Sequence, residues 1–435
     1  MFIYLIRPAG YQNIKTGGTE IKKLLALVLA LVLLVTLAAC AGAPATPAPA
    51  KENTDSPKSD SPKDTSEAAV SSSQEPIYVS VSCAITGDTP QEGEYVRNTV
   101  QYVIDQFNAD GGVDGRPIEL IIEDDGNTAN TAVNVMEKTT ADQRIVMQIG
   151  PHRSASVLAV ETIAKQAGMP FISGGTSKSF YSLDNPYLFR GRACDSLVAS
   201  IAAKYAIEEL GATTVGMIHD TDDYGTGAYD VIAEYVAENY PEVTLIEEGI
   251  TTGAVDMTGP LLNMANAGVT AMVVYVHDND AAILARQYKE LGLDASMKIV
   301  GCSSFANPVY YDLLEEGVGD GIYVVADVSQ TNPDTYFAEF QKAYTDAFGV
   351  APETMAAAYH DIAKIACDAI KRAAQTGKIT RESVRNALAD TSAEALTGNQ
   401  GSLYVSKTNG MDFIHQCLVA VSKGDGTEYI ATVYE

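Results

Sequence analysis

Hydroxyl, glycine and charged residues gather in six short stretches, and each stretch follows a run of apolar residues. These stretches are Thr86–Asp88, Gly150–Ser154, Ser173–Ser177, Asp220–Gly225, His277–Asn279 and Gly301–Ser304. Small residues let backbone N–H groups approach a ligand, and a helix that starts after such a stretch favours an anionic group such as a carboxylate. Ser, Thr and Asp at these places also act as plain helix N-caps. Taken together, the six stretches favour a site for a small polar solute.

Motifs for covalent or cofactor chemistry are broken or absent. Gly225-Thr226-Gly227 resembles the start of a dinucleotide fingerprint, but Asp230 occupies the place of its third glycine. The stretch Gly174–Ser179 lacks the glycine spacing of a phosphate loop, and neither G-x-S-x-G nor H-E-x-x-H occurs. We therefore predict a protein that is not an enzyme and needs no cofactor.

Metal and thiol chemistry have equally weak support. The acidic stretch Asp220–Asp223 beside His219 leaves a divalent-cation site open as an alternative. Such stretches are more often hydrated acidic loops, so no metal site is predicted. Without Cys40 the cysteines are odd in number and show no metal-finger spacing, which favours small buried apolar roles while leaving one disulfide open. These cysteines are Cys83, Cys194, Cys302, Cys367 and Cys417.

Apolar runs alternate with helical patterns along the chain, which predicts an α/β fold of two doubly wound parallel-sheet lobes. The first series of strands comprises Ile77–Ala84, Ile118–Ile122, Ile145–Ile149 and Pro170–Ile172. The second comprises Val215–His219, Val243–Ile246, Ala271–Val276, Lys298–Val300 and Ile322–Val325. Ligands of such sheets bind at the carboxyl ends of the strands, where the polar stretches lie.

The carboxyl-terminal part is expected to complete both lobes. Helical patterns cover Tyr336–Phe348 and Met355–Ala374, and strands are expected near Leu403 and over Phe413–Val421. We assign residues 77–194 and about 329–400 to lobe 1. Residues 195–328 and about 401–435 are assigned to lobe 2.

The amino terminus has the features of an export signal. Lys22 and Lys23 precede the apolar run Leu24–Ala39, which is short for a membrane-spanning helix. Leu37-Ala38-Ala39-Cys40 resembles the lipobox of bacterial lipoproteins, so residues 1–39 are expected to be removed and Cys40 to carry lipid. A plain signal peptide or a short anchor helix is the alternative.

Residues 40–75 form the expected tether between the membrane and the folded body. From Ala41 to about Glu75 the chain is rich in Ala, Pro, Ser, Asp and Lys and has no aromatic residue, a composition that buries little surface. The whole chain has a formal net charge of −27, which disfavours nucleic acid as a partner.

Several motifs occur in an order that resembles the Leu/Ile/Val-binding proteins, which are extracytoplasmic receptors of ABC importers with the type I periplasmic-binding fold. The motifs are Ile85–Gly87, Asn108–Leu120, Glu123–Asp125, Ile149–Pro151, Pro186–Arg190, Asp223–Gly225 and Ala357–Asp361. The resemblance covers about Ile77 to the carboxyl end. It implies two lobes joined by a three-stranded hinge.

The resemblance also implies roles for individual residues. Ser154, Gly175 and Ser177 match first-lobe groups that hold a ligand carboxylate. Asp195 matches an acidic residue near the ligand ammonium. Tyr224 matches the second-lobe tyrosine that closes on the ligand. Tyr359 matches a tyrosine near the lobe crossing, and a simple packing role for Tyr359 is the equal alternative.

Other positions depart from the family pattern. Glu92 stands where a tyrosine is common, Arg153 replaces a small residue or cysteine, and Ser303 stands where leucine-type receptors place a glutamate. His277 and Asp278 occupy a turn that is often aromatic or glycine-rich. Our hypothesis is that Arg153, Glu92 or Asp278 contacts a charged ligand side chain, the alternative being that they are rim residues.

The sequence thus predicts a lipid-anchored solute-binding receptor at the outer side of the cell membrane. It is expected to capture an amino acid or a related small polar solute between its lobes and to deliver it to an ABC permease. A sensory receptor of the same fold is one rival, and an exported α/β enzyme is a second and weaker one.

Overall fold

The computed structural model describes residues 75–87, 89–392 and 396–435, which all belong to one compact unit, Ser71–Glu435. The predicted export signal, Cys40 and the tether up to residue 74 lie outside the described residues. Within the part of the chain that the structure describes, no helix is both long and apolar enough to cross a membrane.

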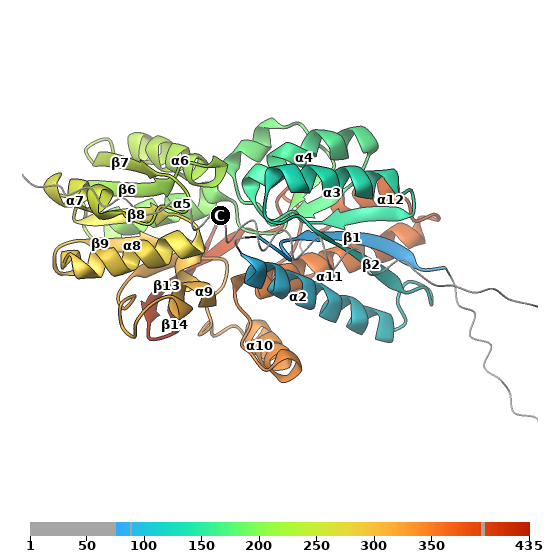
Figure 1. The fold of residues 1–435 in the computed structure, drawn as a ribbon. Coiled ribbons are helices and arrows are strands. Elements are labelled where there is room, and N and C mark those ends of the chain that lie inside the picture. The colour runs from blue at the N-terminus through green and yellow to red at the C-terminus, as the bar shows by residue number, and fades with distance from the viewer. Residues whose placement is uncertain (1–74, 88, 393–395) are drawn as a thin grey trace, which may run out of the picture. The chain divides into compact units, whose positions relative to one another are not determined.

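The first sheet has five parallel strands in the order β2-β1-β3-β4-β5 (Figure 1). Its strands are β1 (Ile77–Cys83), β2 (Ile118–Asp124), β3 (Ile145–Ile149), β4 (Phe171–Ser173) and β5 (Leu188–Arg190). Every residue of β3 is buried, as expected for a central parallel strand that is covered on both faces.

Helices cover both faces of this sheet. In Figure 1, α3 and α4 lie above the strands, and α2 and α11 lie below them. Contacts pair α3 with α4, α2 with α11, and α12 with both α11 and β3. The bounds are α2 (Pro90–Ala109), α3 (Ala129–Ala141), α4 (Ser154–Ala167), α11 (Thr354–Gln375) and α12 (Arg381–Ala389).

The second sheet has seven strands in the order β14-β13-β10-β9-β8-β6-β7. Five of them are parallel, namely β6 (Thr214–Asp220), β7 (Thr244–Ile250), β8 (Ala271–Tyr275), β9 (Lys298–Gly301) and β10 (Tyr323–Ala326). The last two, β13 (Gln416–Lys423) and β14 (Gly426–Tyr434), form an antiparallel hairpin at one edge.

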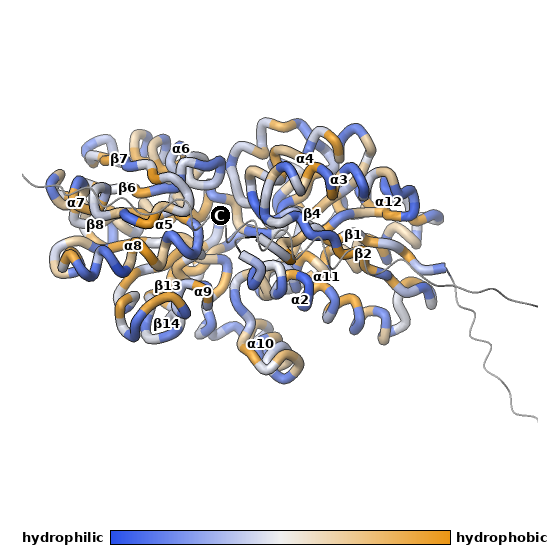
Figure 2. Tube along the Cα trace, in the orientation of Figure 1, coloured by the Kyte–Doolittle hydropathy of each residue, from blue (hydrophilic) through white to orange (hydrophobic). Residues whose placement is uncertain are grey.

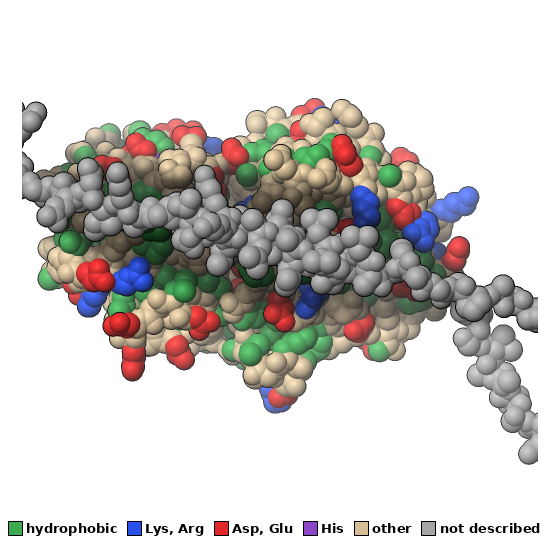
Figure 3. Space-filling view, viewed as in Figure 1, with side chains coloured by type: hydrophobic (Ala, Val, Ile, Leu, Met, Phe, Trp, Pro, Cys, Tyr) green, Lys and Arg blue, Asp and Glu red, His purple; other side chains and the backbone are tan. Residues whose placement is uncertain are grey.

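The helices of the second lobe are amphipathic where they pack on the sheet. In Figure 2, hydrophilic and hydrophobic positions alternate along α8, whose buried residues include Ala281, Leu284 and Ala285. The helices in this part of the chain are α5 (Asp195–Lys204), α6 (Asp223–Asn239), α7 (Thr258–Asn266), α8 (Asp278–Glu290) and α9 (Pro308–Asp312). Figure 3 shows Asp and Glu side chains spread over the visible face, in keeping with the acidic composition.

Shorter elements complete the described fold. They are the 3-10 turns η1 (Lys178–Ser182), η3 (Leu293–Ala295) and η4 (Ser303–Ala306), the π-helical turn η2 (Tyr205–Glu209), the helix α10 (Thr335–Phe348), and the two-residue strands β11 (Thr397–Gly398) and β12 (Gly401–Ser402). The chain passes between the two sheets after β5, after β10 and between β12 and β13.

The predicted fold class is confirmed, with differences at its edges. Strand β5 is too short to show a period, and β14, α7 and α12 were not predicted. Leu403 lies just outside β12, and the strand predicted to begin at Phe413 begins at Gln416. The antiparallel hairpin makes the second sheet mixed. The residue boundaries that we assigned to the lobes stay a prediction.

Candidate functional site

The strand orders place a binding crevice at the carboxyl end of each sheet. In the first sheet the connections leave in opposite directions from neighbouring strands β1 and β3, and in the second from β6 and β8. At such switch points the strand-to-helix turns diverge and leave a crevice. Glu92, Arg153, Tyr224 and Asp278 all follow these four strands.

Both crevices open into one cavity. About 40 Å³ of it admits the centres of water-sized molecules, far less than the roughly 300–1,000 Å³ of typical small-molecule sites. The two walls therefore lie nearly in contact. The cavity is lined by Glu92, His152, Arg153, Ser154, Gly174, Gly175, Thr176, Arg192, Asp222, Tyr224, His277, Asp278, Ser303, Ser304, Asn307 and Met355.

The wall from the first lobe includes a network of backbone groups and hydroxyls beside charged side chains. Ser154 begins α4, and its Oγ accepts hydrogen bonds from the backbone N–H groups of Thr176 and Ser177, both at 3.3 Å. The N–H of Gly175 donates to Ser173 Oγ at 2.8 Å. This network fixes the turn after β4 against the start of α4, where the helix dipole favours a negative charge.

Glu92 and His152 meet at the edge of this wall. The Nε2 atom of His152 lies 3.6 Å from the Glu92 carboxyl group. Burial, together with the nearby positive charges of Arg192 and Arg153, holds the pKa of His152 well below its usual value. The imidazole is therefore neutral at neutral pH, so this contact is not an ion pair.

Two glycines allow the helices behind each wall to approach the strand ends closely. A Cβ on Gly93 would lie 1.8 Å from the carbonyl oxygen of Ala84, and one on Gly225 would lie 2.1 Å from that of Asp220. Only glycine fits such contacts, and each glycine is adjacent to a cavity residue. The close approach thus sets the positions of Glu92 and Tyr224.

The wall from the second lobe consists of rings and carboxylates. The Tyr224 ring packs on Tyr275, with centroids 4.9 Å apart, and stacks on His277 at 5.2 Å. His277 Nε2 lies 2.8 Å from the carboxylate of Asp222, which also caps α6. The rings offer an apolar surface with a polar rim.

Asp278, the first residue of α8, completes this wall. Its two carboxylate oxygens accept hydrogen bonds from Asn307 Nδ2 at 2.9 and 3.1 Å. Glu92 reaches it from the opposite lobe. Burial and the nearby carboxylate of Asp278, with which Glu92 forms a hydrogen bond, raise the pKa of Glu92 well above its usual value.

A buried ion pair lies at the base of the cavity, where the chain passes between the lobes. Arg192 Nε donates to Asp327 Oδ2 at 2.6 Å, and its Nη2 donates to Ser303 Oγ at 3.1 Å. The two charged residues are only 5% and 2% exposed. Although burial alone opposes the charge, Asp327 raises the pKa of Arg192 above its usual value.

The remaining predicted residues lie behind the cavity lining. Ser177 caps η1 and bonds Ser179, while the fully buried Tyr359 packs close to Gly174. Asp195 accepts a hydrogen bond from Tyr275 at 2.8 Å, and burial raises its pKa to about 6. Asp195 and Tyr359 are thus placed to support the site, and Thr176 lines the cavity next to Ser177.

Sequence reasoning missed several lining residues, chiefly His152, Arg192, Asp222 and Asn307. His152 and Asp222 lie within polar stretches that the sequence analysis identified, so the predicted residues next to them could have pointed to them. Arg192 follows the unpredicted strand β5, and Asn307 lies beyond the turn that was considered after β9.

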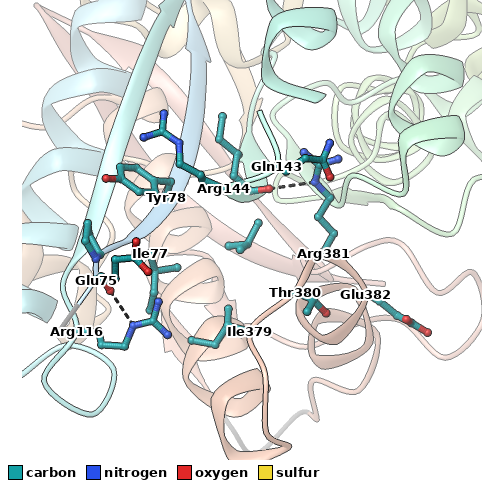
Figure 4. A pocket seen from close by; sticks show the side chains of 13 residues that line it. Glu75, Ile77, Tyr78, Arg116, Gln143, Arg144, Ile379, Thr380, Arg381 and Glu382 are labelled. Atoms are coloured by element: carbon teal, nitrogen blue, oxygen red, sulfur yellow. Dashed lines mark hydrogen bonds between the residues drawn. The ribbon is translucent and has the colours of Figure 1, made fainter. Parts of the chain in front are cut away.

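A second hollow lies at the amino ends of β1 and β3, away from the predicted turns (Figure 4). It has about 530 Å³ of space for water-sized molecules. The guanidinium groups of the arginines that line it are already bonded to backbone carbonyl groups or to Asp142. Arg381 donates to the carbonyl groups of four residues, and Arg116 Nε donates to that of Glu75. Arg144 pairs with Asp142 at 2.7 Å. Arg381 and Arg116 thus tie backbone segments together.

Within the described ranges, no group of three or more His, Cys, Asp or Glu side chains is arranged to hold a metal ion. The acidic residues that left this alternative open are used otherwise, since Asp222 contacts His277 and Asp220 accepts from the His277 N–H. The five cysteines of the folded body are free and buried.

The model of the family described as periplasmic binding protein matches residues 76–427. The chain belongs to this family. The prediction of a solute-binding protein that is not an enzyme is thereby confirmed.

Individual relatives agree with this assignment. The leucine-, isoleucine-, valine-, threonine- and alanine-binding protein of Pseudomonas aeruginosa is 26% identical over 347 residues, which are 77% of this chain and 87% of the relative. It bears out the resemblance to the Leu/Ile/Val-binding proteins.

Solved structures show the same fold. The substrate-binding protein LivJ of Streptococcus pneumoniae in complex with isoleucine aligns with a TM-score of 0.74 and 24% identity, covering 83% of this chain and all of that one. A solute-binding protein of Rhodopseudomonas palustris in complex with 3,4-dihydroxybenzoic acid aligns with a TM-score of 0.72 and 20% identity, covering 82% of this chain and 96% of that one.

Proposed function

We propose that this chain is the extracytoplasmic receptor of an ABC importer and captures an amino acid or a similar small polar solute between its two lobes. A lipid on Cys40 would hold it at the membrane, and the closed form would deliver the solute to a permease. The bound solute leaves chemically unchanged.

One observation carries the proposal. Polar groups from the switch points of two separate sheets line a single cavity. A solute that touches both walls binds the closed arrangement more tightly than the open one, and therefore shifts the population toward closure. Closure then becomes the signal that a permease reads.

The chemistry of the walls supports a solute with a carboxylate. Ser154 and Thr176 lie at the start of α4, where an anion is favoured. The rings of Tyr224 and His277 face this position from the other lobe. The P. aeruginosa relative binds, by its name, leucine, isoleucine, valine, threonine and alanine, and an amino acid fits this arrangement of donors and rings.

A thermal-shift screen of the full chain tests the proposal. Amino acids, short peptides, polyamines, benzoates and urea-like solutes would be added singly, and hits measured by calorimetry. Saturation at about one hundred times Kd adds about 2.7 kcal/mol to the free energy of unfolding, which corresponds to a rise of roughly 5 to 10 °C. A panel without any hit, or a hit that is chemically converted, contradicts the proposal.

The lipid anchor has a separate test. Cells expressing the chain would be fed a labelled fatty acid, and the Cys40→Ser variant would serve as the control. Label is expected on the natural chain and absent from the variant. Equal release of both forms from membranes by a salt wash would count against a lipid anchor.

A further inference from the structure

The two glycines of the motif Gly225-Thr226-Gly227 make close contacts with different lobes. Gly225 meets the carbonyl oxygen of Asp220 in its own lobe. A Cβ on Gly227 would instead lie 3.0 Å from the Oγ atom of Ser177 and 3.9 Å from its Cβ. Ser177 follows β4 of the first sheet, whereas Gly227 lies in α6, which follows β6 of the second. At Gly227 the two lobes thus touch without a side chain on α6.

Ser177 has little freedom to move away from a side chain at that point. It is fully buried, and its Oγ atom accepts a hydrogen bond from the N–H of Ser179 and so caps η1. Its own N–H donates to Ser154 Oγ at 3.3 Å, and its carbonyl oxygen accepts from Arg190 Nη2 at 3.1 Å. Ordinary van der Waals contact begins at 3.4 Å, so a Cβ at position 227 would press on a hydroxyl group that is held in place.

The contact lies beside the cleft and continues along α6. Helix α6 contacts both α4 and η1 of the first lobe, and Figure 1 shows α6 and α4 side by side where the lobes meet. Two turns beyond Gly227, Glu234 pairs with Lys178, the residue after Ser177. One turn before Gly227, Tyr224 lines the cavity. The distance to which α6 approaches Ser177 therefore sets how far the wall with Tyr224 can close.

We propose that Gly227 is the stop for lobe closure and thereby selects solutes by size: without a side chain on α6 at this point, the two walls come nearly into contact, and the closed form can enclose a small solute. This inference rests on the proposed function and adds a limit on the size of the solute. The cavity, with about 40 Å³ of space for water-sized molecules, shows how closely the walls approach when position 227 carries no side chain.

Size selection follows from the geometry of a site with two walls. A solute gains affinity from closure only when it contacts both walls. A side chain at position 227 would end closure earlier and leave the walls farther apart. A small solute would then lose its contacts with one wall, while a larger solute would still reach both. The preference between the two solutes would shift toward the larger one.

A disulfide between the two positions tests the contact without knowledge of the solute. Disulfides join residues whose Cβ atoms lie about 3.5–4.5 Å apart, and the separation of 3.9 Å at this pair falls within that range. In the double variant Gly227→Cys with Ser177→Cys, oxidised glutathione is expected to form the cross-link, which peptide mass spectrometry detects. The single variants are the controls. The five cysteines of the folded body are buried and are expected to stay reduced.

The variant Gly227→Ala separates closure from stability. Alanine is a better helix former than glycine, so the unfolding temperature of the free protein is expected to stay equal or to rise. Affinity for the smallest solute that binds is nevertheless expected to fall by about 10-fold, as measured by calorimetry on the full chain. Gly259→Ala, in α7 of the same lobe, is the matched control, because a Cβ there meets nothing within 4 Å. It should bind like the natural chain.

Solutes of graded size test the selection itself. The probes are L-alanine, L-valine and L-leucine for amino acids, glycylglycine and L-leucyl-L-leucine for peptides, putrescine and spermidine for polyamines, benzoate and 2-naphthoate for benzoates, and urea and N-methylurea for urea-like solutes. In the class that binds, Gly227→Ala is expected to weaken the larger members less than the smallest one, or to strengthen them.

A second variant shows whether the effect passes through Ser177. In a Ser177→Ala background the Oγ atom is gone, and the two Cβ atoms, 3.9 Å apart, are in ordinary contact. The loss of affinity caused by Gly227→Ala should therefore be smaller in this background than in the natural chain. An equal loss in both backgrounds would mean that position 227 does not act against Ser177.

The outcomes distinguish the two proposals. If the double cysteine variant forms no cross-link, or if Gly227→Ala keeps both the affinity and the size preference of the natural chain, the closure stop is refuted while a solute-binding role stands. An equal loss of affinity for small and large members of one class also refutes size selection. If no solute of the screen binds the natural chain, the proposed function fails and the inference with it, even where the cross-link forms.

Discussion

The two walls of the cleft are built on similar βα units but differ in chemistry. The first-lobe wall is held by hydrogen bonds among backbone groups and hydroxyls, as Ser154 shows by accepting from two N–H groups. The second-lobe wall is held by rings and carboxylates that contact one another, as in Tyr224, His277 and Asp222. Under the proposed function, the first wall would orient an anion and the second would enclose the rest of the solute.

The largest expected effect on stability comes from breaking the ion pair at the base of the cavity, which the two walls share. Arg192→Leu leaves Asp327 buried without its partner, which is expected to lower the free energy of unfolding by about 3–5 kcal/mol. Chemical denaturation measures the loss. The double variant Arg192→Leu with Asp327→Leu should recover most of it, because the uncompensated charge is gone. A single variant as stable as the natural chain would show that this pair does not hold the base.

Titration of Asp195 probes the support of the ring wall, since Asp195 bonds Tyr275 and Tyr275 packs on Tyr224. Burial raises its pKa from 3.8 to about 6, so the folded state holds a proton that the unfolded state has lost. The stability from this proton is fully present below pH 3.8 and is lost as the pH rises to about 6. The whole change amounts to about 3 kcal/mol.

The control for this titration is Asp195→Asn, which cannot ionise. The difference in unfolding free energy between the natural chain and the variant is expected to fall as the pH rises from about 4 to 6. A difference that is flat, or that grows with pH, would mean that the carboxyl group is not buried as described.

A matched pair of glycine variants compares the two walls directly. Gly93→Ala and Gly225→Ala each force a Cβ against a strand-end carbonyl and are expected to cost about 1–3 kcal/mol of stability. Each should also weaken solute binding, because it displaces Glu92 or Tyr224. Gly259→Ala, where a Cβ meets nothing within 4 Å, is the control. Unchanged affinity in one cleft variant would assign binding to the opposite wall.

The smallest effect is expected at the rim. Lys178 of η1 pairs with Glu234 of α6 across the two lobes, and both side chains are exposed. Because exposed ion pairs contribute at most about 1 kcal/mol, Lys178→Gln should reduce solute affinity by no more than about fivefold. The reduction should vanish at high salt. A larger loss of affinity that does not depend on salt would show that the rim, and not only the walls, contributes to solute binding.

The sequence predicted those features of the fold and of the site that depend on residues close together in the chain. Strands such as β3 and β8 were predicted because buried parallel strands are continuous apolar runs, and the turns that follow them contain most of the cavity lining. The strand β5 has only three residues, too few for a recognisable pattern of apolar residues. It was not predicted, and Arg192, which follows it, was missed for the same reason.

Contacts between distant segments could not be predicted in this way. Glu92 and Asp278 are far apart in the sequence, and only the closed arrangement of the lobes brings them together. The departures from the family pattern drew attention to both residues, but their proximity to each other and the hydrogen bond from Asn307 to Asp278 came from the structure.

A crystal structure of the full chain with its best-binding probe from the solute screen tests the central claim most directly. The account predicts the probe between the two walls, with its anionic group at Ser154 and Thr176 and its remainder against Tyr224 and Asp278. A probe bound to one wall alone, or in the hollow beside Arg116 and Arg381, would contradict it.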